Sequence, residues 1–388
     1  MRPVTIGTTT LGLLLLVGCS SSGGSAASHD GGMETGQMSH PHADSGHPAD
    51  SGASADASKS KDGAAADVGT VTGHDSGGGG GPMFGGCPLF AADYAYNQDI
   101  SQSSVDPTSA TIISSLTSLA PSIAAEFPGG EYYNVVPGAQ TEVHVQTASA
   151  YGFGLDGGFF YDTDAGLAAV TVPIPSGVVY ENMTTPNADH HMMVIQQGTC
   201  LLYELYAENP SSATTGWDVL VQWDLRGSPQ IPGNLDVGST TQAGTPLLPG
   251  VIWPVDVQAG AIDHAIDIVM ADNAIMPCSY VHPASTVRYS GAPAGDGVPY
   301  GARLRLKSTF DTSAFTGTQA LVVVRALQKY GMIPTDASGE ARSVFRLGQS
   351  PDGGTLDQTD MNQLNVLTWS DFDVMPLGTV IHPAGCTP

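Results

Sequence analysis

The grouping of β-forming residues into short runs is the feature that most constrains the fold of this chain. Between residues 87 and 388, runs rich in β-branched and aromatic residues alternate with turn-forming segments, and the 388-residue chain holds 49 Gly and 27 Pro. Short runs separated by turn residues are typical of β-sandwiches and barrels, not of alternating βα units. We therefore predict a mainly β, sandwich-like or barrel-like domain. The runs are 131–136, 141–147, 167–174, 189–197, 200–207, 218–225, 262–270 and 302–310.

Two or three short helices are expected beside these strands. Residues 108–119 follow Asp106-Pro107, a common helix start, and their apolar residues recur on one face. Residues 318–330 show the same periodicity and stop before Gly331, which suits the left-handed conformation at a helix end. Residues 359–366 are the third and shortest candidate.

The first 18 residues have the pattern of an export signal. A short apolar stretch follows Arg2 and closes on Leu16-Val17-Gly18-Cys19, which resembles the signal of bacterial lipoproteins, whose cysteine is acylated and becomes the first residue after cleavage. The alternative is an ordinary secretory signal with a chance cysteine. The stretch is shorter than the ~20 apolar residues that span a bilayer. The resemblance implies an exported lipoprotein that is held at the cell envelope, on the outer membrane or cell surface, by lipid on Cys19.

Residues 19–86 are dominated by Gly, Ser, Ala, Asp and His. Such a segment cannot bury enough apolar surface to offset its ordering entropy, so we predict a disordered tether ahead of a globular ectodomain at 87–388. Part of it resembles the Met/His-rich tails of copper-handling proteins, because thioether and imidazole suit copper ions. A solvated spacer is the alternative. The candidate copper ligands are Met33, Met38, His40, His42 and His47.

Charge and missing motifs exclude several classes of function. The chain has 37 acidic and 12 basic residues, a net charge of −25, so a nucleic acid would be repelled. There is no P-loop and no G-x-G-x-x-G leading a helix, which argues against nucleotide binding. G-x-S-x-G and H-E-x-x-H are absent too, which argues against α/β-hydrolase lipases and zincin proteases. The many carboxylates remain available for calcium or for sugar hydroxyls.

Four cysteines remain once Cys19 is assigned to lipid, and export favours their oxidation. Four cysteines allow three pairings, and the absence of C-x-x-C rules out a zinc ribbon. Cys87 and Cys386 lie just inside the two ends of the globular part, where a bridge would clasp the termini. We therefore expect Cys87–Cys386 together with Cys200–Cys278.

Several segments resemble an uncharacterised family of proteins secreted by soil bacteria. The matching segments run in order through most of the globular part, so the resemblance is broad. It implies export, and no activity comes with it. Among these segments are Tyr96-Asn97-Gln98-Asp99, Ala188-Asp189-His190-His191, Cys200-Leu201-Leu202-Tyr203-Glu204-Leu205-Tyr206 and Ala326-Leu327-Gln328-Lys329-Tyr330-Gly331-Met332-Ile333.

A β-hairpin is expected around the turn 196–199, where Gly198 can take a positive φ. If the loop has two or four residues, the numbers of any two residues that face each other across the hairpin add up to 395. His191 would then lie opposite Glu204, and Asp189 opposite Tyr206. Because side chains alternate along a strand, these four residues share one face, whereas the opposite face takes their neighbours in the chain.

This face is the best candidate for chemistry. A histidine beside a glutamate, with an aspartate nearby, forms a plausible general acid/base group, so Glu204, His191 and Asp189 are the candidate catalytic residues, and Tyr206 would contact substrate. The alternative is a structural polar pair, because cross-strand His–Glu contacts are common.

The remaining candidates are further apart in the chain. Arg305 and Lys307 alternate with other residues on one expected strand and could hold a substrate carboxylate, or merely offset nearby acids. Asp224 ends a strand, where sheet proteins often place working side chains. Carboxylates that could bind calcium or sugar are Asp162, Asp164 and Glu181.

We therefore predict a lipid-anchored ectodomain that binds or cleaves an extracellular glycan. If it is an enzyme, a hydrolase or a lyase fits best. A copper-handling lipoprotein and a non-enzymatic structural or adhesive surface protein are the alternatives.

Overall fold

A computed structural model describes residues 81–125, 130–147, 153–155, 158–160, 171–229, 239–288, 297–383 and 386. The expected signal, Cys19, the Met/His cluster, and Asp162 and Asp164 lie outside the described residues. The described residues belong to one compact unit, Val71–Pro388. Among them, no helix combines the length and the apolar character needed to cross a membrane.

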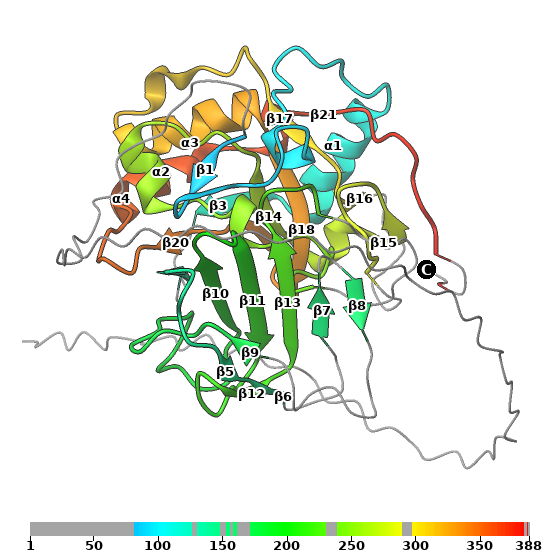
Figure 1. Cartoon of the computed structure of the whole chain (residues 1–388). Helices are drawn as coiled ribbons and strands as arrows, with labels where there is room; N and C mark the ends of the chain where they lie inside the picture. Colours follow the sequence, from blue (N-terminus) through cyan, green and yellow to red (C-terminus); the bar gives the residue numbers. More distant parts are fainter. Residues whose placement is uncertain are drawn as a thin grey trace, which may run out of the picture. The chain divides into compact units, whose positions relative to one another are not determined.

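The mainly β prediction is confirmed, and the larger of two main sheets has seven strands in the order β20-β4-β10-β11-β13-β7-β8. Strands β10, β11 and β13 pair antiparallel, whereas β4 lies parallel to β10. Figure 1 shows β10, β11 and β13 side by side in green. The strands are β4 (Glu131–Val136), β7 (Phe153–Leu155), β8 (Gly158–Phe160), β10 (His190–Gln196), β11 (Leu201–Ala207), β13 (Val219–Asp224) and β20 (Gly348–Gln349).

The second main sheet has six strands in the order β21-β17-β18-β14-β19-β3. The chain passes from the six-stranded to the seven-stranded sheet at two places, from β3 to β4 and from β19 to β20, and these strands pair in parallel in each sheet. The short link between β19 and β20 therefore places Arg346 where the sheets meet. The strands are β3 (Ser122–Ala125), β14 (Ile266–Ala271), β17 (Leu304–Leu306), β18 (Met332–Ser338), β19 (Arg342–Phe345) and β21 (Phe372–Val374).

Short two-stranded pairs complete the described β structure. They are β1 (Met83–Phe84) with β2 (Cys87–Pro88), β5 (Val143–His144) with β9 (Thr171–Val172), β6 (Gln146–Thr147) with β12 (Thr215–Trp217), and β15 (Ile275–Tyr280) with β16 (Val298–Tyr300). The folded part includes residues before the expected boundary at residue 87, because Phe84 packs edge-on against Tyr133 at 4.8 Å.

Both faces of the β10–β11 hairpin are buried. Met193 and Ile195 face one apolar cluster together with Trp223, whereas Met192 and Val194 face another. A strand that is buried on both sides explains why its sequence is almost continuously apolar. The polar residues at its start therefore stand out as exceptions that need partners.

The helices pack on the six-stranded sheet. The expected helices at 108–119 and 318–330 are confirmed as α1 (Ser109–Leu119) and α3 (Thr318–Lys329), and the third as α4 (Gln358–Met361), which continues as a 3-10 helix to Val366. The sequence reading missed α2 (Pro254–Ala259), which starts with proline and ends at Gly260 with a φ of +86°. The apolar faces of α1 and α3 share one core with β14 and β17.

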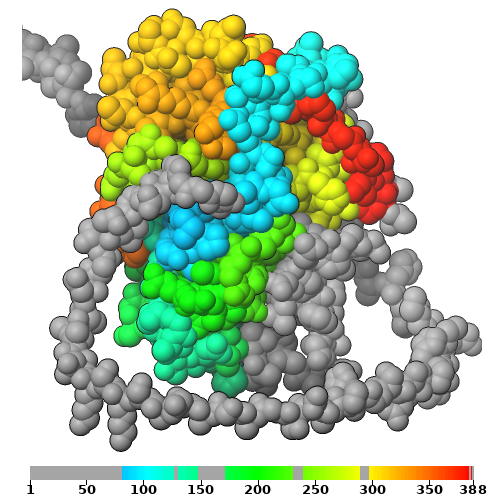
Figure 2. Space-filling view, turned by 45° about the horizontal axis from the view of Figure 1, so that its top comes forward, coloured from blue at the N-terminus to red at the C-terminus, as the bar shows by residue number. Residues whose placement is uncertain are grey.

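The first described residues lie across both sheets. Leu89 and Phe90 join the apolar cluster that contains Trp223, and the backbone of Ile100 bonds to Lys329 at the end of α3. Figure 2 shows this blue segment between the green residues of the seven-stranded sheet and the orange residues of α3.

All four expected disulfide cysteines are bridged, but the expected pairing is wrong. The bridges are Cys87–Cys200 and Cys278–Cys386, with Cα–Cα distances of 5.5 Å each. Cys87 follows β1, which lies beside the hairpin turn, and this turn carries Cys200. The bridges therefore fasten neighbouring segments and do not clasp the two ends.

Candidate functional site

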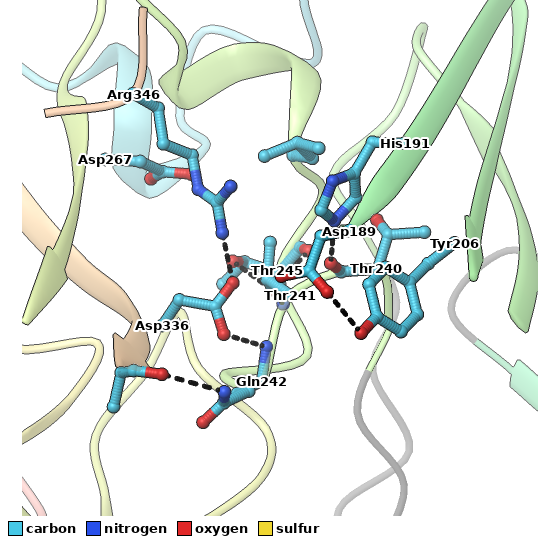
Figure 3. A network of polar contacts seen from close by, with 12 residues as sticks. Asp189, His191, Tyr206, Thr240, Thr241, Gln242, Thr245, Asp267, Asp336 and Arg346 are labelled. Atoms are coloured by element: carbon cyan, nitrogen blue, oxygen red, sulfur yellow. Dashed lines mark hydrogen bonds and ion pairs between the residues drawn. The ribbon is translucent and has the colours of Figure 1, made fainter. Parts of the chain in front are cut away.

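A cavity of about 690 Å³ lies between the ends of strands from the two sheets. Its lining comes from β10, β11, β14 and β18, from the loops around residues 240 and 287, and from Arg346. Figure 3 shows the polar network on its wall. The polar lining residues are Asp189, His191, Tyr206, Glu208, Asp218, Ser239, Thr240, Thr241, Gln242, Thr286, Arg288, Asp336, Ser338 and Arg346.

The predicted faces of the hairpin are correct, but its predicted register is off by two. Paired residue numbers sum to 397, so His191 lies opposite Tyr206 and Glu204 lies opposite Met193. The loop occupies 197–200 instead of 196–199, because Cys200 takes a left-handed conformation with a φ of +53° and bonds to Cys87. A shift of two keeps every side chain on its predicted face.

Asp189 and Tyr206 form a pair at the cavity. The Tyr206 hydroxyl donates to Asp189 Oδ1 at 3.0 Å, and the Tyr206 ring lies 5.0 Å from the imidazole of His191. Burial and the carboxylate of Asp189 raise the pKa of Tyr206 far above its usual value. The hydroxyl therefore stays protonated and orients the Asp189 carboxylate.

His191 is held by three partners. Its Nδ1 lies 2.6 Å from Glu181 Oε2 and 3.8 Å from Glu131 Oε2, and its Nε2 lies 3.1 Å from the carbonyl oxygen of Thr240. Burial alone would lower the pKa of His191, but the two carboxylates outweigh it and raise the pKa to about 9. Burial and repulsion by Glu131 raise the pKa of Glu181 to about 7.

The parallel register of β4 and β10 explains why Glu131 meets His191. Met193 pairs with Tyr133, so the preceding same-face positions, His191 and Glu131, stand at the same level. The backbone of Glu181 donates to the carbonyl of His191 at 3.1 Å, which brings the second carboxylate to the same imidazole.

Arg346 joins the two sheets electrostatically. Its guanidinium donates to Glu131 Oε1 at 2.9 Å and bonds to Asp336 on β18. Burial raises the pKa of Asp336, and Arg346 opposes that shift. Asp267 lies nearby on β14, where burial raises its pKa to about 7 although the Tyr96 hydroxyl donates to it at 2.6 Å. Figure 3 shows Arg346 directed at Asp336.

Glu204, one of the predicted catalytic residues, does not line the cavity. Its side chain is fully buried and accepts four hydrogen bonds at 2.8–2.9 Å, from the Trp223 indole, the Thr240 hydroxyl and the backbones of Leu247 and Leu248. Glu204 thus connects β11 to the loop that contains Thr240, and it positions that loop. It reaches His191 only through Thr240.

Of the predicted substrate contacts, Tyr206 lines the cavity, whereas Arg305, Lys307 and Asp224 do not. Arg305 donates to backbone carbonyls of residues 100–103, and Lys307 donates to the carbonyl of Ser370 at 2.7 Å. Asp224 pairs with Arg226 at 2.6 Å. Arg305 on β17 therefore holds the segment before α1 in place, and its positive charge has a structural role.

Sequence reasoning missed Glu131, Asp336, Arg346 and Gln242. One signal was available, since Asp267 is a carboxylate inside an otherwise apolar strand and Asp336 follows the apolar residues Met332 and Ile333 in another, where an acidic residue needs a partner. Glu181, a candidate for binding calcium or sugar, lies against His191.

Comparisons of this chain with protein-family models, with curated proteins and with solved structures found no match.

Proposed function

We propose that the cavity binds an extracellular glycan. The observation that supports this is the chemistry of its lining, in which carboxylates, hydroxyls, an amide and guanidinium groups surround a space of about 690 Å³. Ligand sites typically measure roughly 300–1,000 Å³. Sugar hydroxyls both donate and accept hydrogen bonds, so they suit this mixture of groups.

The charge of the lining favours a neutral glycan over an acidic one. Arg346 is already paired with Glu131 and Asp336, and Arg288 with Asp272. Because both cations are compensated, a substrate carboxylate would meet Asp189, Glu208 and Asp218, which form no ion pair with another described residue, and be repelled.

Asp189 is the residue best placed to transfer a proton to or from a bound glycan. Its carboxylate is exposed at the cavity and is oriented by Tyr206. His191 is less suitable, because Glu181 and the Thr240 carbonyl engage its two ring nitrogens. If the glycan is cleaved, Asp189 therefore acts as the general base or acid.

The test is a screen of the full chain against neutral and acidic polysaccharides that records both binding and product release. Gln242→Ala, which removes a lining amide, should weaken binding of a neutral glycan, and Asp189→Asn should abolish product release if there is any. Asp352→Asn, at an exposed loop position, is the matched control. Failure of every neutral polysaccharide to bind, or binding unaffected by Gln242→Ala, would contradict the proposal.

We further propose that the protein is exported and held at the cell envelope by lipid on Cys19. The lipoprotein-like sequence that ends at Cys19 supports this location. Cys19→Ser should abolish incorporation of labelled fatty acid and release the protein from membranes. Membrane retention equal to that of the unaltered chain would refute the anchor.

A further inference from the structure

We propose that Glu131, Glu181 and His191 bind a divalent first-row transition metal ion in the wall of the cavity. One ligand atom from each residue lies within 4.8 Å of the other two. Ligand bonds of about 2.0–2.2 Å allow ligand atoms around one ion to lie up to about 4.4 Å apart. The distances from His191 Nδ1, 2.6 Å to Glu181 and 3.8 Å to Glu131, bracket the spacing of adjacent ligands.

The orientation of His191 requires either a proton or a metal ion between its Nδ1 and the carboxylates of Glu181 and Glu131. Its Nε2 lies 3.1 Å from the Thr240 carbonyl, which only accepts hydrogen bonds, so Nε2 carries a proton. In a neutral imidazole, Nδ1 would then present a lone pair to two carboxylates. Either a proton or a metal ion must lie between them. A carbonyl on the distal ring nitrogen is the usual arrangement behind a metal-ligating histidine.

Glu131 supplies the second, independent observation. Its Oε1 accepts from Arg346, but its Oε2 has no hydrogen-bond partner among the described residues, although the side chain is only 5% exposed. Buried carboxylate oxygens are normally satisfied. This unsatisfied atom is directed at the same Nδ1, and a bound cation would satisfy it.

The set of ligands selects the type of metal. Calcium and magnesium prefer oxygen ligands alone, whereas imidazole together with carboxylates suits Mn²⁺, Fe²⁺, Co²⁺ and Zn²⁺. The ion would also balance negative charge, because Arg346 faces three carboxylates here, those of Glu131, Asp336 and Glu181. His191 and Arg346 both line the cavity, so water could reach the ion from that side.

Mn²⁺ is the best probe, because it binds His-rich and Met-rich segments such as residues 29–47 weakly compared with later first-row ions. Titration of the metal-depleted full chain, followed by the electron paramagnetic resonance signal of free Mn²⁺, should show one saturable site. Glu131→Gln and Glu181→Gln should each weaken binding by at least about tenfold. Glu142→Gln, which alters an exposed carboxylate, should leave binding unchanged.

A second measurement guards against variants that fail to fold. The bound Mn²⁺ in a chain with His29, His40, His42 and His47 changed to Ala should still show electron spin-echo modulation from an imidazole ¹⁴N, because His191 remains. Ca²⁺ in tenfold excess should not displace the Mn²⁺. The proposal is overturned by a lack of saturable Mn²⁺ binding, by the absence of ¹⁴N modulation, or by folded Glu131→Gln and Glu181→Gln variants that bind as tightly as the unaltered chain. The first result would identify the cation beside Nδ1 as a proton alone.

Discussion

Two buried glutamates in the seven-stranded sheet, Glu204 on β11 and Glu131 on β4, have opposite surroundings. Glu204 accepts four hydrogen bonds, two of them from backbone amides. Glu131 has one guanidinium on Oε1 and, among the described residues, no hydrogen-bond donor on Oε2. Burial is therefore common to a structural carboxylate and to a candidate ligand. The number of donors around the oxygens distinguishes them.

The same contrast applies to the arginines. The Arg305 guanidinium donates hydrogen bonds to backbone carbonyls of the segment before α1, whereas Arg346 neutralises carboxylates beside the cavity. Groups whose hydrogen bonds are all used within the fold hold loops in place. Glu131, by contrast, faces the carboxylate of Glu181 and retains a capacity to bind a cation.

Loss of the saturated glutamate should have the largest effect on stability. Glu204→Ala leaves four donors, including Leu247 N and Leu248 N, without their acceptor in a dry interior. We expect the free energy of unfolding to fall by about 3–5 kcal/mol, measured by urea denaturation. Glu142→Ala, at an exposed position, should change it by less than about 0.5 kcal/mol. Similar losses of stability for Glu204→Ala and Glu142→Ala would show that the four hydrogen bonds of Glu204 do not stabilise the fold.

Asp267 should show an intermediate effect that depends on pH. Burial raises its pKa to about 7 in the folded protein, whereas in the unfolded chain it ionises near pH 4. The unfolded chain therefore releases this proton first, and the contribution of Asp267 to stability falls as the pH rises from about 4 to 7 and is then fully lost.

Asp267→Asn should remove this loss. The Asn carbonyl still accepts from Tyr96, so the variant should gain up to about 4 kcal/mol relative to the unaltered chain between pH 4 and pH 8. Urea denaturation at pH 4, 6 and 8 measures this. A stability difference that is independent of pH would show that Asp267 is ionised throughout.

The smallest effect on stability is expected for Glu131→Gln. The amide oxygen can still accept from Arg346, and loss of the charge relieves repulsion by Glu181, so we expect a change within about 1 kcal/mol. Thermal melting of the metal-depleted protein measures it. A loss as large as that of Glu204→Ala would mean that Glu131 is as fully committed to the fold as Glu204.

Local patterns allowed much of the architecture to be predicted. The helix-start signal at Asp106-Pro107 and the periodicity before Gly331 identify α1 and α3, and alternation along β10 and β11 places His191 and Tyr206 on one face. These features depend on residues that are close in the chain.

The remainder depends on long-range pairing, which no local pattern encodes. The parallel register of β4 with β10 brings Glu131 to His191, and the passage from β19 to β20 brings in Arg346. The hairpin register was wrong because Cys200 takes a turn position with positive φ, which a cysteine rarely does without a constraint such as its bridge to Cys87.

The two disulfide loops follow one another along the chain, 87–200 and then 278–386, and neither encloses the other. No bridge therefore crosses residues 201–277. A protease that nicks the chain within that stretch yields two fragments that only noncovalent packing keeps together, even under oxidising conditions. Asp189 and His191 would remain on the N-terminal fragment, and Asp336 and Arg346 would lie on the C-terminal one. A single cut would thus divide the residues that line the cavity between two separable fragments.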